Sequence, residues 1–258
     1  MRITKLLAAA VLSLVLGGVT LAQAEPTDIT IRVLSKDAKF IGTSMGGMRV
    51  TLSDAKTGEV LAQGLTKGGT GNTGLLMHKD GGRRAQLSDD SAASFQATLD
   101  LDAPRLIEAK AYGPLGHPAS AHEVTATQWV VPGRNLTGGD GWVLELPGFV
   151  VELQSPEAPI VASSSDKSIA LKAKVTMMCG CPITPGGIWD ADGYEVKGIL
   201  YRDGTKAGET ALAYAGEASL FAGSLPVPAP GRYSLVVYAY DPANGNTGVA
   251  KTALVVGE

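Results

Sequence analysis

Cysteine, histidine, aromatic residues and charge are all scarce in this chain of 258 residues. It has two cysteines and three histidines, and aromatic residues make up 5% and charged residues 18% of it. Two cysteines exclude a disulfide-rich scaffold, and the 33 glycines follow no triplet period, which excludes collagen. Hydrophobic residues reach 45%, too many for a disordered chain, so we expect one or two compact domains with apolar cores.

The first 24 residues are predicted to be a signal peptide that is removed. Arg2 and Lys5 precede an apolar run over residues 6–21, and the Ala-Gln-Ala sequence at 22–24 fits a signal peptidase. The run is short and lacks a basic residue on its far side, which disfavours an uncleaved membrane anchor. No later apolar run approaches membrane-spanning length, so we predict a periplasmic or secreted protein without a transmembrane segment after cleavage.

The charge balance limits the classes of partner. Cleavage after residue 24 leaves 20 basic residues against 25 acidic ones. An acidic chain without a basic patch argues against nucleic acid and anionic membranes as partners. We therefore expect the partner to be another periplasmic or envelope protein.

Hydrophobic residues alternate with period two through most of the chain. Ile29, Ile31 and Val33 share one face of their segment, and the same pattern recurs over residues 169–175 and 235–239. This pattern is typical of half-buried strands, and turn-forming residues separate the segments. We predict an all-β protein made of two consecutive antiparallel β-sandwiches.

A short stretch with two prolines, residues 155–159, separates the two strand-rich halves. We assign residues 25–154 to the first sandwich and residues 160–258 to the second, each of ordinary sandwich size. Because the linker is short, the two domains are expected to touch.

The end of the chain carries a hairpin pattern. Residues 238–240 precede Asp241 and a Gly-Asn sequence at 245–246, and a last strand follows over residues 250–256. This pattern resembles the last hairpin of bacterial immunoglobulin-like domains, which implies an immunoglobulin-like sandwich for the second half.

In the first half, residues 50–61 contain a turn with Asp54, Lys56, Thr57 and Gly58. This segment is similar to the transthyretin-like or carboxypeptidase-regulatory-like sandwich. The resemblance implies a carrier, spacer or recognition module and carries over no catalytic residue.

Both cysteines stand together in the sequence Met177-Met178-Cys179-Gly180-Cys181, directly after a predicted strand. Alternation places Met177, Cys179 and Cys181 on one face and Met178 on the other. Three interpretations stay open: a soft-donor site that suits Cu(I), a redox-active Cys-Gly-Cys disulfide, and a passive disulfide beside methionines that fill the core.

Two tryptophans are candidate partner-binding residues. Trp189 follows the cysteines and stands beside the Asp-x-Asp-Gly sequence at 190–193, for which a polar turn is favoured over a calcium loop. Trp142 ends a glycine-rich loop, and aromatic side chains beside such loops often anchor partners. For both Trp142 and Trp129, burial in the first core is the interpretation that we favour.

Two catalytic patterns match without the required context. Ser44 lies in a G-x-S-x-G sequence, but a strand is predicted after it where a nucleophile elbow needs a helix. Residues 69–74 fit G-x-G-x-x-G, but no helix is predicted to follow, so we expect a loop.

We therefore expect an exported, non-catalytic binding or accessory protein. Its second domain would present Cys179, Cys181, Met177 and Met178 to copper, the only cofactor expected, or to the redox centre of a partner. The alternatives are a thiol–disulfide redox protein that uses the same cysteines, and a cell-surface spacer or adhesion module.

Overall fold

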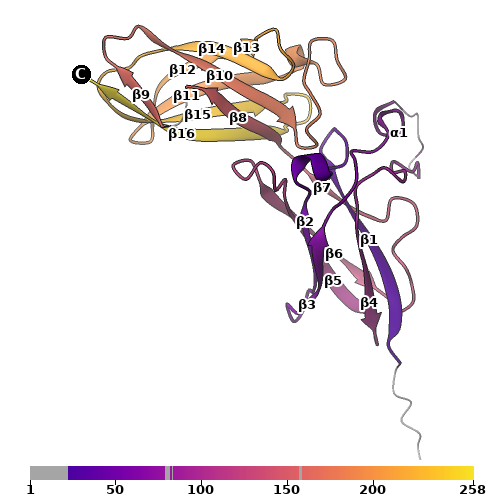
Figure 1. Ribbon diagram of the computed structural model, residues 1–258. Helices are drawn as coiled ribbons and strands as arrows, with labels where there is room; N and C mark the ends of the chain where they lie inside the picture. The colour runs from indigo at the N-terminus through magenta and orange to yellow at the C-terminus, as the bar shows by residue number, and fades with distance from the viewer. Residues whose placement is uncertain (1–22, 79–81, 83, 157–158) are drawn as a thin grey trace, which may run out of the picture.

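The computed structural model describes residues 23–78, 82, 84–156 and 159–258. The predicted signal peptide lies outside the described residues except for its last two positions. Figure 1 shows two bodies made of strands that meet at their ends. The prediction of an all-β protein built from two sandwiches is confirmed.

The first sandwich contains the strands β1 (Glu25–Ser35), β2 (Arg49–Asp54), β3 (Val60–Leu65), β4 (Phe95–Leu101), β5 (Arg105–Gly113), β6 (His122–Val130) and β7 (Trp142–Leu146). One sheet has the order β4-β1-β7 and the other has the order β3-β2-β5-β6. Neighbours are antiparallel except β1 and β7, which pair in parallel.

Period-two alternation builds the core between these two sheets. Ile29, Ile31 and Val33 of β1 lie in one buried cluster with Val50 and Leu52 of β2. Their neighbours along β1 and β2 point to the opposite faces of the sheets, because successive side chains of a strand alternate. The two sheets therefore pack face to face, and the residues of β1 that the alternation predicted form one side of this contact.

The second sandwich contains the strands β8 (Phe149–Ser155), β9 (Ile160–Ser163), β10 (Ser168–Met177), β11 (Glu195–Arg202), β12 (Thr205–Ala211), β13 (Ala213–Tyr214), β14 (Leu220–Pro226), β15 (Gly231–Tyr240) and β16 (Thr247–Gly257). Its sheets have the orders β13-β14-β10-β8 and β12-β11-β15-β16-β9. β9 and β16 pair in parallel, and the other neighbours are antiparallel.

This strand order is that of an immunoglobulin-like domain. In the lettering used for such domains, β8 and β9 are the two parts of strand A, and β10 to β16 are strands B, C, C′, D, E, F and G in chain order. The two sheets then have the orders D-E-B-A and C′-C-F-G-A. Tyr233 near the start of β15 donates its hydroxyl to the Ala229 carbonyl at 2.8 Å, which is the tyrosine corner of such domains. The immunoglobulin-like prediction for the second half is confirmed by strand order and by this bond.

Strand pairing divides the chain earlier than the expected linker. β8 pairs with β10, although most of its residues were assigned to the first domain. Phe149 and Val151 also lie in the core of the second sandwich. By pairing, the division falls at Pro147-Gly148, and the stretch expected to be the linker lies between β8 and β9. A strand A that is split between two sheets explains why prolines occur inside the domain.

Helices are short in the described part of the chain: α1 (Thr73–Met77) and the 3-10 helices η1 (Thr43–Met45) and η2 (Ala191–Gly193). Residues 69–74 were expected to form a loop without a helix, which is wrong, because they lead into α1. The Asn72 side chain caps this helix by accepting from Leu75 N at 3.2 Å. None of these helices is long and apolar enough to cross a membrane.

Candidate functional site

The sequence from Met177 to Cys181 forms a tight turn at the end of β10. Gly180 N donates to Met177 O at 2.8 Å, and Met177 N donates to Cys181 O at 3.2 Å. Gly180 has φ +78°, in the left-handed region that favours glycine. The turn therefore needs its central glycine, and it brings the two cysteine Cα atoms to 5.4 Å.

Cys179 and Cys181 are bonded as a disulfide and are buried, with 2% and 8% of their surface exposed. Met177 shares the core of the second sandwich with both cysteines, whereas Met178 lies in the core of the first sandwich. Alternation predicted this division of the side chains. β10 ends at Met177, so the turn sends Met178 toward the other domain without a continuous strand.

A methionine of the first domain contacts this turn from the other side. A Cβ built on Gly180 would lie 2.5 Å from the Sδ atom of Met45, which is buried at the end of η1. Met45 was not among the predicted site residues. No local signal identifies it, because only the packing of the two domains brings it to the cysteines.

The cysteines line a cavity of about 380 Å³ between the two domains. Lys39, Ser44 and Thr73 contribute walls from the first domain, and Lys39 Nζ donates to Thr73 Oγ1 at 2.9 Å. Ser44 is in η1, and the next element is the strand β2, as the sequence predicted. The elbow from strand to helix that a nucleophilic serine needs is therefore absent around Ser44.

The three tryptophans have different environments. Trp189 lines the same cavity, is buried, and donates Nε1 to Asp37 O at 2.9 Å across the domain junction. Trp142 is buried in the first core at the start of β7. A partner-binding role for either residue stays a prediction. Trp129 was expected in the core, which is wrong: it is 56% exposed, with Lys56 Nζ 5.3 Å from its ring centre.

The turn between β15 and β16 also contacts the first domain. Lys36 Nζ donates to Asn244 O at 2.9 Å, and Asn244 Nδ2 donates to Asp37 Oδ2 at 3.3 Å. Asn246 is buried and bonds both backbone groups of Gly148, accepting from its N at 2.5 Å and donating to its O at 3.0 Å. The Gly-Asn sequence that marked the hairpin thus also holds the point where the chain passes between domains.

Carboxylates gather around this contact. Burial and the nearby Asp241 carboxylate raise the pKa of Asp37 above its ordinary value, although Lys36 lowers it. Burial, followed by the charges of Asp241, Asp37 and Asp190, raises the pKa of Tyr194 to about 12. Tyr194 therefore stays a neutral hydroxyl at physiological pH. Asp190 itself caps η2 by accepting from Asp192 N at 3.2 Å, so its Asp-x-Asp-Gly sequence forms a turn.

A loop of the first domain packs along the free side of β8. Ser120 Oγ accepts from Val151 N at 3.3 Å, and His117 Nδ1 lies 2.7 Å from Glu152 Oε1. His122 Nε2 lies 2.7 Å from Pro147 O. His117 and His122 thus contact a carboxylate and a backbone carbonyl of the segment over residues 147–152.

Across the described ranges, no group of three or more histidine, cysteine, aspartate and glutamate side chains is placed to hold a metal ion. The donors at the junction that remain for a soft metal are sulfur atoms: those of the two cysteines once their bond is reduced, and thioether sulfur. Thiolate and thioether ligands select Cu(I) over hard cations.

Comparison with known proteins finds solved structures of low sequence identity. No family model matches the chain, and no curated protein does. The fibronectin(III)-like modules of Clostridium thermocellum CbhA are 14% identical, with a TM-score of 0.29 over 93% of this chain and 92% of theirs. A chimeric titin Z1Z2 is 15% identical, with a TM-score of 0.24 over 92% of this chain and 99% of that one.

An engineered protein is 16% identical over half of this chain, with a TM-score of 0.32, and the match spans 24% of that protein's length. All three TM-scores are below 0.5. The immunoglobulin-like assignment therefore rests on strand order and on the tyrosine corner.

Proposed function

We propose that this chain is an exported, non-catalytic binding protein whose domain junction takes up Cu(I) when Cys179 and Cys181 are reduced. One observation carries the proposal: both cysteines line a cavity between the domains, and the thioether of Met45 contacts the turn that holds them. The N-terminal signal pattern supports export to the periplasm or beyond.

The oxidation state of the cysteines decides whether the site can bind. A disulfide offers no thiolate, so a thiol reductant must first supply two electrons and two protons to convert the bond to two thiols. Binding of a soft cation then displaces those protons, because thiolates are the ligands. The protein would bind copper under reducing conditions, and under oxidising conditions the two cysteines would form the disulfide and bind no copper.

The methionines divide between two roles in this proposal. Met45 supplies the thioether from the first domain, and Met177 is the second candidate because it shares the core of the cysteines. Met178 belongs to the first core, and we assign it to packing. The cysteines are buried, whereas Ser44 and Ile188 at the rim of the cavity are exposed, so an ion could enter from solvent.

The test is a competition titration of Cu(I) against a chelator, under anaerobic conditions, on protein whose thiols have been counted before and after reduction. We expect binding by the reduced protein alone, loss of binding in Cys179→Ser and Cys181→Ser, and weaker binding in Met45→Leu. Met48→Leu is the matched control, because Met48 is equally buried but its Sδ lies against Gly113. Equal affinity in all variants would refute the copper site.

Thiol–disulfide exchange with an envelope partner is the second candidate, favoured by the bonded state of the cysteines. A partner dithiol would attack one sulfur, form a mixed disulfide, and leave as a disulfide while both cysteines become thiols. The measurement is the reduction potential of the pair. A value below about −300 mV, as in structural disulfides, would contradict exchange.

For the first sandwich we propose the transthyretin-like class, with a carrier, spacer or recognition role. The turn that carries the resemblance joins β2 and β3, and Asp54 Oδ1 accepts from Lys56 N at 2.8 Å and Thr57 N at 3.0 Å. In a spacer or adhesion role, the Cys179→Ser variant should still bind the same partner as the wild type. Pull-down from the native envelope with both proteins would test this.

A further inference from the structure

A cleft of about 750 Å³ opens between β8 and β16 on the second sandwich, away from the cysteines. β8 is the outer strand of one sheet. In the other sheet, β9 covers the outer side of β16 at Leu254–Gly257 only. The two sheets therefore separate along residues 249–253, and their interior is accessible from the side.

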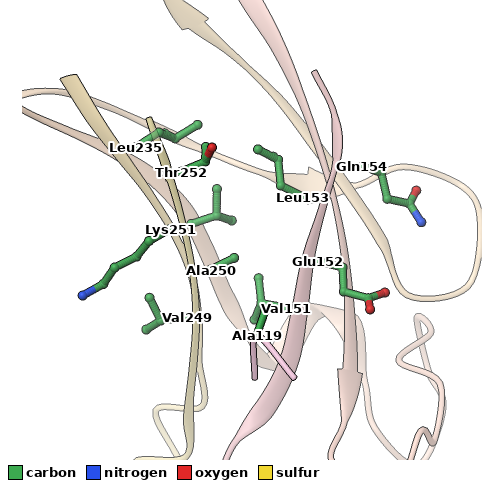
Figure 2. A pocket seen from close by; sticks show the side chains of 11 residues that line it. Ala119, Val151, Glu152, Leu153, Gln154, Leu235, Val249, Ala250, Lys251 and Thr252 are labelled. Atoms are coloured by element: carbon green, nitrogen blue, oxygen red, sulfur yellow. The ribbon is translucent and has the colours of Figure 1, made fainter. Parts of the chain in front are cut away.

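Apolar side chains form most of the interior of the cleft, although four polar residues also line it: Glu152, Gln154, Lys251 and Thr252. Figure 2 shows Val151 and Leu153 pointing from β8 toward Ala250 and Thr252 of β16. Leu235 of β15 lies behind them and belongs to the buried core. A molecule that entered the cleft would extend this core.

One side of the cleft also offers an unpaired strand edge. Among the described residues, Gly248–Ala253 of β16 have backbone hydrogen bonds to β15 and none on the opposite side. The unoccupied position beside these residues lies on the same side of β16 as β9, which pairs with Leu254–Gly257. A strand of about six residues, spanning about 20 Å, would fill it.

The edge of β8 is already protected, which makes β16 the open one. Ser120 accepts the outward N–H of Val151, and His117 contacts Glu152. An added strand would therefore hydrogen-bond to β16, with alternate side chains entering the cleft.

Three valines are exposed on the outer surface beside this edge. Val161 of β9 is 78% exposed, and Val249 and Val255 of β16 are each 37% exposed. Lys251 lies between the two β16 valines and, within the part of the chain that the structure describes, forms no ion pair. Figure 2 shows its side chain directed away from the cleft.

We propose that the edge of β16 over Gly248–Ala253 binds an extended peptide segment of a partner protein by strand addition. The segment alternates apolar side chains, which fill the cleft, with outward side chains that include an acidic residue opposite Lys251. Strand addition uses main-chain bonds for affinity and side-chain pockets for specificity, and both are present here.

A peptide fits better than the other occupants of such a cleft. A lipid chain would fill the apolar space but leave the backbone groups of β16 without partners. A second copy that paired through the same edge would bring two Lys251 side chains together, since a twofold interface repeats the same surface.

The test uses three synthetic peptides of nine residues, measured by isothermal titration calorimetry with the full mature protein. The first alternates valine with glutamate and threonine. The second has the same composition with its valines grouped, and the third is the first with N-methyl groups on alternate amides. We expect the third to bind on the order of 100-fold more weakly, because each lost main-chain bond costs several-fold in affinity. The second should also bind more weakly, because its valines no longer alternate into the cleft.

Lys251→Glu tests the charge preference. We expect it to weaken the glutamate peptide about fivefold and to favour a lysine-containing counterpart. Lys172→Glu is the matched control, because Lys172 is an exposed lysine on β10, an interior strand of the other sheet. Hydrogen exchange should show that the peptide protects the outward-facing amides among residues 248–253, which alternate with those bonded to β15.

Three results would overturn the proposal. The N-methylated peptide could bind as well as its parent, which would reduce the cleft to an apolar surface. A fatty acid could saturate the cleft while no peptide binds. Finally, light scattering could show a dimer whose formation alone protects residues 248–253, which would assign the edge to a second copy.

Discussion

The two ends of β8 lie in contrasting surroundings. At Phe149 the strand is closed in: the ring lies 5.3 Å from that of Tyr194 in an edge-to-face arrangement, and the backbone lies against Gly248. At Leu153, four residues on, the strand faces the apolar cleft and is only partly buried. The Phe149 end of β8 is thus fully packed, and we call it the finished end; the Leu153 end borders an open cleft, and we call it the unfinished end.

The difference comes from the residues that pack against each end of β8. At the finished end, a Cβ on Gly248 would lie 2.7 Å from the Cβ of Phe149, so glycine permits a close approach that leaves no space. Asn246 then bonds the backbone of Gly148. At the unfinished end, the loop that contains Ser120 covers the edge of β8, and its Ala119 lines the open cleft between β8 and β16. The domain junction is therefore closely packed at one end of β8, while an open cleft remains at the other end.

The largest effect should come from Phe149→Ala. Removal of this fully buried ring should lower the free energy of unfolding by about 3–5 kcal/mol. Leu153→Ala at the open end should cost about 1 kcal/mol, because its side chain lacks cover on one side. Urea unfolding followed by circular dichroism measures both. Equal losses at the two positions would mean that the cleft is closed in solution.

Asn246→Ala should have the next largest effect. It leaves the buried N–H and C=O of Gly148 without partners, which should cost about 2–3 kcal/mol in the same urea experiment. Asn135→Ala is the control, because its side chain accepts one bond, from Asp28 N, at an exposed position. A loss as small as that of the control would show that the junction does not depend on this contact.

The smallest effect concerns pH. Because the pKa of Asp37 is raised in the folded protein, folding favours its protonated form. The stability that it contributes is present at low pH and is lost as the pH rises through the folded pKa. Asp37→Asn should therefore match the wild type at low pH and be slightly more stable at neutral pH.

Asp54 provides the opposite sign for comparison. Backbone bonds from Lys56 and Thr57 lower the pKa of Asp54, so its contribution is present at neutral pH and is lost as the pH falls. Asp54→Asn should be less stable than the wild type at neutral pH and should approach it in acid. The measurement is the free energy of unfolding of both variants as a function of pH. If it changed with pH in the same direction for both, relative to the wild type, both assignments would be contradicted.

Much of the fold followed from local pattern. Alternation at Ile29, Ile31 and Val33 predicted a core face correctly, and the Gly-Asn sequence predicted the hairpin between β15 and β16. The domain boundary was displaced, because prolines mark a break in a strand equally well within a domain and between two domains. Trp129 was misplaced because a single aromatic residue at the end of a strand does not show which face is covered.

Only the features of the candidate site that depend on neighbouring residues in the sequence were predicted. Alternation separated Met178 from Met177 and the cysteines, and the structure assigns them to different cores. Met45 and the Asn246–Gly148 contact had no sequence signal, because their partners are distant in the chain. The cleft had none either, since the lining residues Leu153, Ala250 and Leu235 resemble ordinary core residues of any sandwich.

The sequence by itself determined the strands, their buried faces and the tight turn at Gly180, because near neighbours along the chain set backbone conformation and alternation. Only the tertiary structure decided that this turn lies against Met45 between two domains and that β16 keeps an unpaired edge. Those features depend on which distant segments meet, and the hydrophobic effect that drives them together does not specify partners.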